Sequence, residues 1–120
     1  MKSKNDPRHQ KRIHSIQALF AWGVTGNIDD DSISSIIPEI PSIDLLIKEA
    51  APKWPIEQIN KVELAILRYA IWELKNQPNT PPKVIIDEAI EISKEFCDTN
   101  SSAFVNAVLG NIFKKQDGQN

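Results

Sequence analysis

Cysteine, glycine and long apolar runs are scarce in this sequence, and each scarcity excludes a class of protein. Cys97 is the single cysteine, so no disulfide can form within the chain, and one cysteine with two histidines matches no zinc-ligand spacing. No stretch approaches the roughly 18 apolar residues of a membrane span, and the first residues lack the apolar core of a signal peptide. We therefore expect a cytoplasmic protein with no membrane association, no metal and no cofactor.

The polar residues do not indicate an active site. The aspartates at 29–31 lack the glycine and the final glutamate of a calcium loop. The acidic residues of segment 83–96, Glu88 among them, are mixed with lysines as on an exposed helical face, which explains them better than a catalytic carboxylate pair. The four glycines form no phosphate-binding loop, and no nucleophile has a base placed beside it. We expect no catalytic residues, and these arguments alone indicate a small helical binding domain that is not an enzyme.

Residues 60–74, NKVELAILRYAIWEL, are apolar around most of a helix and predict the central, buried helix of a bundle. Lys61, Arg68 and Lys75 are spaced seven apart and predict a narrow stripe facing solvent. Glu73 falls on the opposite side, among apolar residues, where an unpaired carboxylate is strongly destabilising. Either the helix end lets Glu73 reach water, or another side chain donates hydrogen bonds to it.

Charge is divided unevenly along the chain. The formal net charge is −2, but residues 1–14 carry a net charge of +4, so the remainder carries −6. A basic arm on an acidic body indicates contact with a polyanion at one end of the molecule. The alternative is that a short basic N-terminus merely aids solubility. Residues 1–7 are expected to form a flexible basic arm, and residues 116–120 a frayed tail.

A first helix, from Pro7 to Gly23 or Gly26, has two distinct faces. Its apolar stripe consists of Ile13, Ile16, Phe20 and Val24. Its other face carries Arg8, Lys11, Arg12 and Ser15, continued by Leu19 and Trp22. Cations beside an aromatic ring are typical of surfaces that bind single-stranded RNA, where the cations contact phosphates and the ring contacts a base. The alternative is that Leu19 and Trp22 pack against a neighbouring helix.

The remaining elements are also helical. Short helices are predicted at 32–37 and 43–51, an initial turn at 56–59, a helix at 83–96 capped by Thr80, and a last helix at 103–115. The fold class is therefore all-α, a compact bundle of five to seven helices in a single domain spanning residues 1–120.

Three blocks of sequence carry a family resemblance. Residues 8–22 read RHQKRIHSIQALFAW and residues 62–74 read VELAILRYAIWEL, while residues 82–109 contain PKVIIDEAIEISKEF and SSAFVNAVL. Together, and in this order, they resemble the NusB family of bacterial transcription antitermination factors. The resemblance implies a fold of two small helical subdomains and a non-catalytic role in transcription regulation. It also implies binding to the boxA-like leader of rRNA transcripts together with the ribosomal protein NusE, within the RNA polymerase antitermination complex, and a possible homodimer.

The resemblance assigns roles to individual residues. The basic tract of the family corresponds to Arg8, Lys11 and Arg12, and its base-contacting aromatic residue corresponds to Phe20. A glutamate of the family corresponds to Glu73, whose carboxylate can accept hydrogen bonds from a base and so read sequence. These five residues are the expected RNA-binding set.

The protein-partner surface of the family corresponds to Asn100, Ser101 and Phe104. This chain departs from the family pattern here, because Asn100 replaces an aspartate and Ala103 a basic residue. The basic tract is also thinner, since His9 stands where the family usually has arginine or alanine. An alternative function is therefore a protein-binding helical module that has lost specific RNA binding.

Overall fold

The structure is a computed structural model that describes residues 6–116, except for the side chain of Gln116. Helix α1 (Pro7–Thr25) begins where the carboxylate of Asp6 accepts a hydrogen bond of 2.8 Å from the backbone N–H of Arg8. It ends at Gly26, whose φ of 79° allows its N–H to donate to the carbonyl of Trp22. The expected flexible arm and frayed tail lie mainly outside the described residues, but Pro7 already belongs to α1.

The segment after α1 forms two short 3-10 turns and one α-helix. The turns are η1 (Asp31–Ile33) and η2 (Ile37–Glu39), and α2 (Ile40–Ala50) follows directly. The helix predicted at 32–37 is therefore wrong. The helix predicted at 43–51 exists but begins at Ile40, because a proline in the first turn needs no hydrogen-bond partner for its missing N–H.

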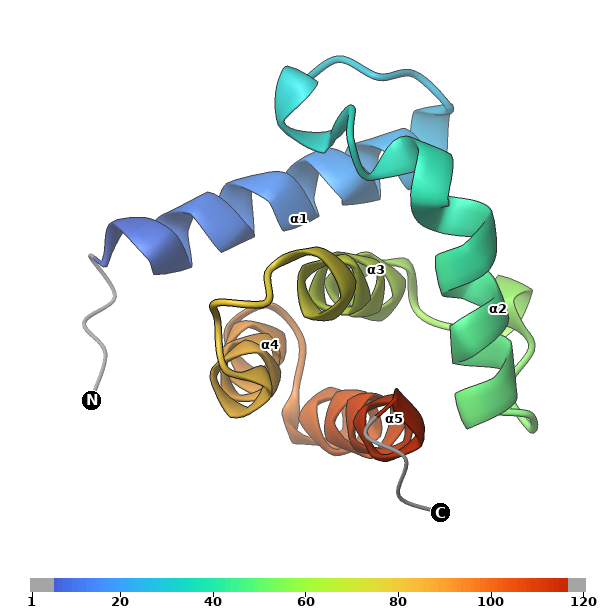
Figure 1. The fold of residues 1–120 in the computed structure, drawn as a ribbon. Coiled ribbons are helices and arrows are strands. Elements are labelled where there is room, and N and C mark those ends of the chain that lie inside the picture. Colours follow the sequence, from blue (N-terminus) through green and yellow to red (C-terminus); the bar gives the residue numbers. More distant parts are fainter. Residues whose placement is uncertain (1–5, 117–120) are drawn as a thin grey trace.

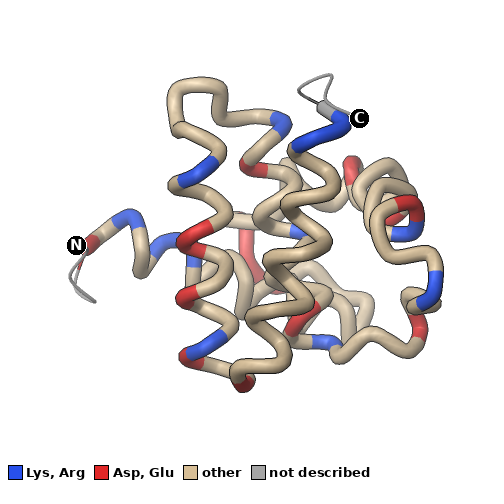
Figure 2. The backbone as a smooth tube through the Cα atoms, turned by 90° about the horizontal axis from the view of Figure 1, so that it is seen from below, with Lys and Arg blue, Asp and Glu red and all other residues tan. Residues whose placement is uncertain are grey.

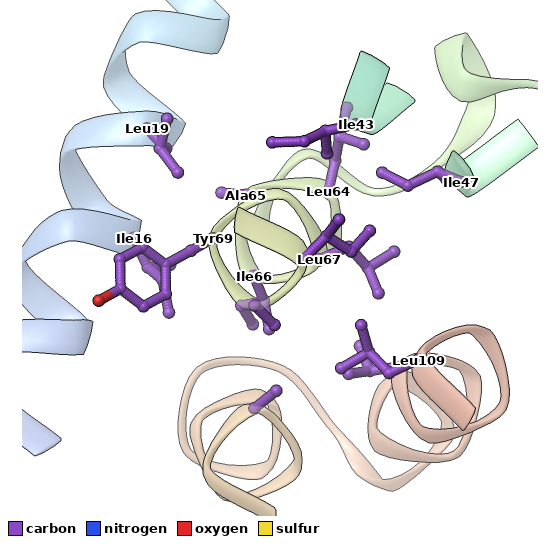
Figure 3. Packing of buried hydrophobic residues seen from close by; sticks show 14 of the residues in the cluster. Ile16, Leu19, Ile43, Ile47, Leu64, Ala65, Ile66, Leu67, Tyr69 and Leu109 are labelled. Atoms are coloured by element: carbon purple, nitrogen blue, oxygen red, sulfur yellow. The ribbon is translucent and has the colours of Figure 1, made fainter. Parts of the chain in front are cut away.

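Helix α3 (Lys61–Asn76) follows a 3-10 turn, η3 (Ile56–Gln58), and is the central element as predicted. Its start is fixed by Asn60, whose side-chain oxygen accepts hydrogen bonds from the N–H groups of Val62 and Glu63. Side chains from around the helix are buried in the core (Figure 3): Leu64, Ala65, Ile66, Leu67, Tyr69, Ala70 and Ile71.

The last two helices are α4 (Pro82–Phe96) and α5 (Thr99–Gln116). Pro81 is the residue preceding α4 and no side chain caps the helix, so the predicted capping role of Thr80 is wrong. Helix α5 begins four residues earlier than predicted, because Asp98 accepts a hydrogen bond of 2.8 Å from the N–H of Ser101 and stabilises an additional first turn.

The helices pack around α3. Figure 1 shows α3 at the centre, with α1 above it, α2 beside it and α4 and α5 below it, so each of the other four α-helices contacts α3. The buried apolar residues of all five α-helices belong to one core cluster. Residues 6–116 contain α-helices and 3-10 turns without any strand, which confirms the predicted all-α bundle.

Arg68 is largely shielded from solvent, so the predicted solvent stripe is wrong at this residue, whereas Lys61 and Lys75 are exposed as predicted. Its side chain is 11% exposed and donates two hydrogen bonds of 2.9 Å to the carboxylate of Asp44 on α2. Its guanidinium also lies 5.5 Å from the ring centre of Trp22 on α1. One arginine therefore connects three helices, and Trp22 packs within the bundle, which was the alternative considered for it.

Candidate functional site

A buried ion pair joins α1 to α3. Nε of Arg12 lies 2.9 Å from Oε1 of Glu73, and Nη2 lies 2.7 Å from Oε2, so the guanidinium binds the carboxylate in a bidentate manner. The two side chains are only 9% and 6% exposed. Of the two possibilities left open for Glu73, the structure therefore shows the second, in which another side chain donates to it.

The network extends to α4 through Glu88, which is 1% exposed. Nη1 of Arg12 lies 3.2 Å from Oε1 of Glu88, and Nδ1 of His9 lies 2.9 Å from the same oxygen. Because a carboxylate only accepts, Nδ1 of His9 is the donor. Nε2 of His9 lies 3.8 Å from Glu95. The expectation that Glu88 is exposed is wrong, since this glutamate pairs with two residues of α1.

The ion pair raises the pKa of Arg12 and contributes to the raised pKa of its neighbour Tyr69. Hydrogen bonding to Glu73 raises the pKa of the Arg12 guanidinium above its usual value, although burial acts in the opposite direction. Burial, followed by the negative charge of Glu73, raises the pKa of Tyr69 to about 12. Figure 3 shows the ring of Tyr69 reaching from α3 toward α1, near Ile16. Tyr69 therefore stays neutral at physiological pH.

A cleft of about 460 Å³ opens beside this ion pair. Its lining is mixed, with cations from the start of α1 (Figure 2), two aromatic rings of α3, and several hydroxyl and amide groups. The lining residues are Arg8, Lys11, Arg12, Ser15, Ser32, Ser35, Tyr69, Trp72, Glu73, Gln77 and Thr80. A second depression of about 230 Å³ shares Arg8, Arg12 and Thr80 with it. The two hollows therefore form a continuous surface.

Four of the five expected RNA-binding residues line this cleft. Arg8 and Lys11 are exposed, whereas Arg12 and Glu73 are buried and neutralise each other. Phe20 is not with them. It is 39% exposed and lines a separate apolar groove of about 180 Å³ between α1, α3 and α4. Because Phe20 lies nine residues after Lys11, the two point about 180° apart on the helix. The helix side expected to be apolar is thus partly exposed at Phe20.

The three residues expected to bind a protein partner are divided between surface and interior. Asn100 and Phe104 line a cleft of about 350 Å³ together with Trp54, which is 55% exposed and meets Phe104 edge to face. Ser101 is buried, and its hydroxyl donates a hydrogen bond to Glu63. Asn100 and Phe104 are therefore available at the surface, while Ser101 holds α5 to α3.

Sequence reasoning missed the aromatic wall of the first cleft. Tyr69 and Trp72 were assigned to the buried helix because they belong to its apolar run, but both reach the cleft. Their ring centres are 5.9 Å apart. Gln77, the residue that directly follows α3, received no role from the sequence and also lines the cleft. The spacing could have indicated this wall, because Tyr69, Trp72 and Glu73 are at positions i, i+3 and i+4 and therefore lie on the same face of the helix.

Neither a group of metal-binding side chains nor a helix able to cross a membrane is found among residues 6–116. Among these residues, no three histidine, cysteine or acidic side chains are grouped so that they can hold a metal ion. Within the same range, every helix is too short or too polar to cross a membrane.

Comparison with known proteins identifies the family. The NusB family model matches residues 30–114. The transcription antitermination protein NusB of Treponema denticola is 36% identical, with 90% of this chain and 96% of that protein covered. The NusB protein of Chloroflexus aggregans is 35% identical, with 88% of this chain and 85% of that protein covered.

Solved structures show the same fold. NusB of T. maritima superposes with a TM-score of 0.82 at 30% identity, covering 96% of this chain and 94% of that one. A chain from the crystal structure of a plectonemic RNA supercoil has a TM-score of 0.83 at 21% identity, covering 94% of this chain and 98% of that one, and this likeness shows the fold alone. The predicted resemblance is confirmed, and this chain belongs to the NusB family, whose members named above are transcription antitermination proteins.

Proposed function

We propose that this protein is a non-catalytic transcription antitermination factor that binds boxA-like single-stranded RNA together with the ribosomal protein NusE during rRNA transcription. Its membership of the NusB family supports the general role. The observation that carries the RNA-binding part is the cleft of about 460 Å³, where Arg8 and Lys11 lie beside aromatic and hydroxyl-bearing side chains. Such a combination suits unpaired nucleotides, since phosphates need cations and bases need flat apolar surfaces.

The five expected RNA-binding residues have different roles in this proposal. Arg8 and Lys11 contact phosphates, because they are exposed at the cleft. The ion pair between Arg8 and Asp6 does not prevent this, since the arginine side chain is 81% exposed and such surface pairs are weak. Arg12 and Glu73 form the base of the cleft and hold α1 against α3. Phe20 contacts RNA only if the strand continues around α1 to the separate groove.

NusE is proposed to bind at the separate cleft of about 350 Å³ that is lined by Trp54, Asn100 and Phe104. Exposed aromatic rings beside polar groups are typical of protein interfaces, where they supply much of the contact energy. Joined to NusE and RNA, the protein acts within the RNA polymerase antitermination complex. Whether it also forms a homodimer is answered by its mass in solution.

A fluorescence polarisation assay tests the proposal. Binding of a boxA RNA is compared with that of a scrambled RNA of the same composition, with and without NusE. We expect preference for boxA, strengthened by NusE, and a shallow salt dependence with a slope of about −1.4 if two cations contact phosphates. Equal binding of both RNAs with and without NusE contradicts the proposal.

A matched pair of variants assigns the phosphate contact. Lys11→Gln removes an exposed charge at the cleft and is expected to weaken binding to boxA and scrambled RNA alike. Lys114→Gln removes an exposed charge from α5 and is the control, because Lys114 does not line the cleft. Equal effects of the two substitutions indicate a general loss of positive charge and contradict the assigned contact.

A protein-binding module without specific RNA binding is the second candidate. One observation favours it: the guanidinium of Arg12, a cation of the expected RNA-binding set, is engaged with Glu73 and Glu88 inside the protein. The phosphate-binding charge of the cleft is therefore small. Partners captured from a bacterial lysate after ribonuclease treatment separate the candidates, since recovery of only non-ribosomal, non-polymerase proteins supports this second function.

A further inference from the structure

Trp72 is an aromatic residue of the cleft whose presence the ion-pair network does not explain. It is half-buried on α3, and its ring centre lies 5.9 Å from that of Tyr69. The other two tryptophans are accounted for elsewhere. Trp22 lies beneath the guanidinium of Arg68, and Trp54 lies against Phe104. Trp72 alone among them lines the 460 Å³ cleft.

The surroundings of Trp72 differ from those of a ring that only completes the core. One part of Trp72 packs against the core cluster. The cleft that it also lines is otherwise rich in hydroxyl groups, from Ser15, Ser32 and Ser35. A volume of about 460 Å³ lies within the range of about 300–1,000 Å³ found for pockets that hold small molecules. The space therefore suits one flat, polar-edged group of nucleotide size.

We propose that the cleft holds one unpaired RNA base stacked on Trp72, with the side-chain amide of Gln77 hydrogen-bonded to the edge of the base. This inference rests on the proposed RNA-binding function and specifies its base-reading site. Lys11 lies at the same cleft and contacts a phosphate next to the bound base. Stacking on an aromatic ring accepts any base, so discrimination comes from the amide.

Gln77 is better placed than Glu73 to read a base. The two carboxylate oxygens of Glu73 accept three hydrogen bonds from Arg12, of 2.9, 3.2 and 2.7 Å. Gln77 is exposed, and its amide group can both donate and accept. Its backbone is held on both sides, because its N–H donates to the carbonyl of Glu73 and its carbonyl accepts from the N–H of Thr80. The side chain thus projects from a fixed point.

The neighbouring depression gives the strand a continuous path. It is about 230 Å³, shares Arg8 and Thr80 with the main cleft, and adds Asn79 and Pro81. A strand whose base occupies the main cleft therefore passes Arg8 as it leaves. RNA is favoured over a protein segment as the occupant, because two exposed cations, hydroxyl groups and a ring match a phosphate-linked base.

The experiment combines protein variants with abasic RNAs. Affinities for boxA RNA and for a series with one base removed at each position are measured for wild type, Trp72→Leu, Trp72→Phe and Gln77→Ala. Leu45→Ala is the control, because it removes an exposed apolar side chain from α2 that lines neither the RNA cleft nor the cleft proposed for NusE. Circular dichroism verifies that each variant is folded, and Gln77→Ala alters an exposed side chain with little risk to folding.

We expect Trp72→Leu to weaken boxA binding about 5- to 100-fold, the effect of losing one stacked base, and Trp72→Phe to lose less. One abasic position should weaken wild-type binding by a similar factor and have little further effect in Trp72→Leu. Gln77→Ala should lower binding about 2- to 10-fold with RNAs carrying the preferred base at that position only. Leu45→Ala should bind RNA as wild type does.

Four outcomes of these affinity measurements overturn the inference. If wild type selects boxA and Trp72→Leu binds equally well, the proposed function stands and the stacking site is wrong. If Trp72→Leu lowers affinity by the same factor for every abasic RNA, Trp72 acts only through the shape of the cleft. If Trp72→Leu abolishes binding to NusE and leaves RNA binding intact, the cleft is a protein site. Lack of RNA binding by wild type overturns both proposals.

Indole N–H signals in a ¹H–¹⁵N NMR spectrum give a readout that does not depend on loss of affinity. Three signals are expected from the three tryptophans. Addition of boxA RNA should shift the Trp72 signal, assigned with Trp72→Phe, and leave that of Trp54 in place. A shift confined to Trp54 contradicts the inference.

Discussion

Replacing Arg12 with methionine is the perturbation that tests the buried network most directly. Methionine retains much of the apolar stem but removes the guanidinium, which makes three hydrogen bonds to Glu73 and one to Glu88. Both glutamates are then left as buried carboxylates, 5% and 1% exposed, without this cation. The substitution therefore tests whether the arginine is a structural connection rather than a surface charge.

The expected loss in the free energy of unfolding follows from the burial of the pair. Removing one member of a buried ion pair costs about 3–5 kcal/mol, because the remaining charge is uncompensated. A protein of this size has a total stability on the order of 6–18 kcal/mol, so the variant loses a large share of it. Arg8→Met is the control on the same helix, since Arg8 is 81% exposed, and its cost should be below about 0.5 kcal/mol.

Urea denaturation followed by circular dichroism measures both variants, and the double variant Arg12→Met/Glu73→Leu completes the test. Removing Glu73 as well should raise the free energy of unfolding by about 1 kcal/mol or more relative to Arg12→Met alone, because the buried carboxylate that lost its arginine is also removed. Two results would contradict this role of the buried pair in holding α1 to α3. One is a cost of less than about 1 kcal/mol for Arg12→Met. The other is a double variant that is less stable than Arg12→Met by as much as Glu73→Leu alone destabilises the wild type.

Three further substitutions and titrations probe other features. The pKa of Tyr69, the single tyrosine, should be about 12 in the native protein and about 10 in urea. Because the native pKa is the higher one, the neutral phenol stabilises the fold fully below pH 10, and this contribution is lost as pH rises toward 12. The absorbance of the phenolate measures both titrations. Arg68→Lys should lower stability by about 1–2 kcal/mol, because lysine cannot bind Asp44 in a bidentate manner while stacking on Trp22, and a cost near zero argues against this connection. Gly26→Ala should cost about 1–2 kcal/mol in a thermal melt through its φ of 79° alone, since an added Cβ meets no atom within 4 Å; an unchanged melting temperature contradicts the left-handed helix end.

The helices that follow from local patterns were predictable from the sequence. The apolar run of α3 identified the central helix, and Pro7 identified the beginning of α1. These signals act over one or two turns and need no knowledge of the fold. The segment 32–37 was harder, because spacing of isoleucines alone does not distinguish an α-helix from two 3-10 turns that bury Ile33 and Ile36.

The partners of charged residues were not predictable, because they come from distant parts of the chain. A helical wheel placed Arg68 on a polar stripe, but α2 covers that stripe and supplies Asp44. It singled out Glu73 as a carboxylate that must reach either water or a donor, but it could not decide between the two or name Arg12, which lies 61 positions away. The family resemblance brought both residues into the candidate site without indicating that they bind each other.

If the protein binds RNA as proposed, we expect the network and the exposed cations of α1 to affect that binding in different ways. Arg12 contacts α3 and α4 and carries a neutralised charge, whereas Lys11, one residue earlier on the helix, is exposed. Arg12→Met should therefore weaken RNA binding by displacing the start of α1, with little change in the salt slope. Lys11→Gln should remove one phosphate contact and make the slope shallower by about 0.7. If Arg12→Met instead reduces the slope as much as Lys11→Gln does, its guanidinium reaches a phosphate in the complex and the ion pair with Glu73 opens when RNA binds.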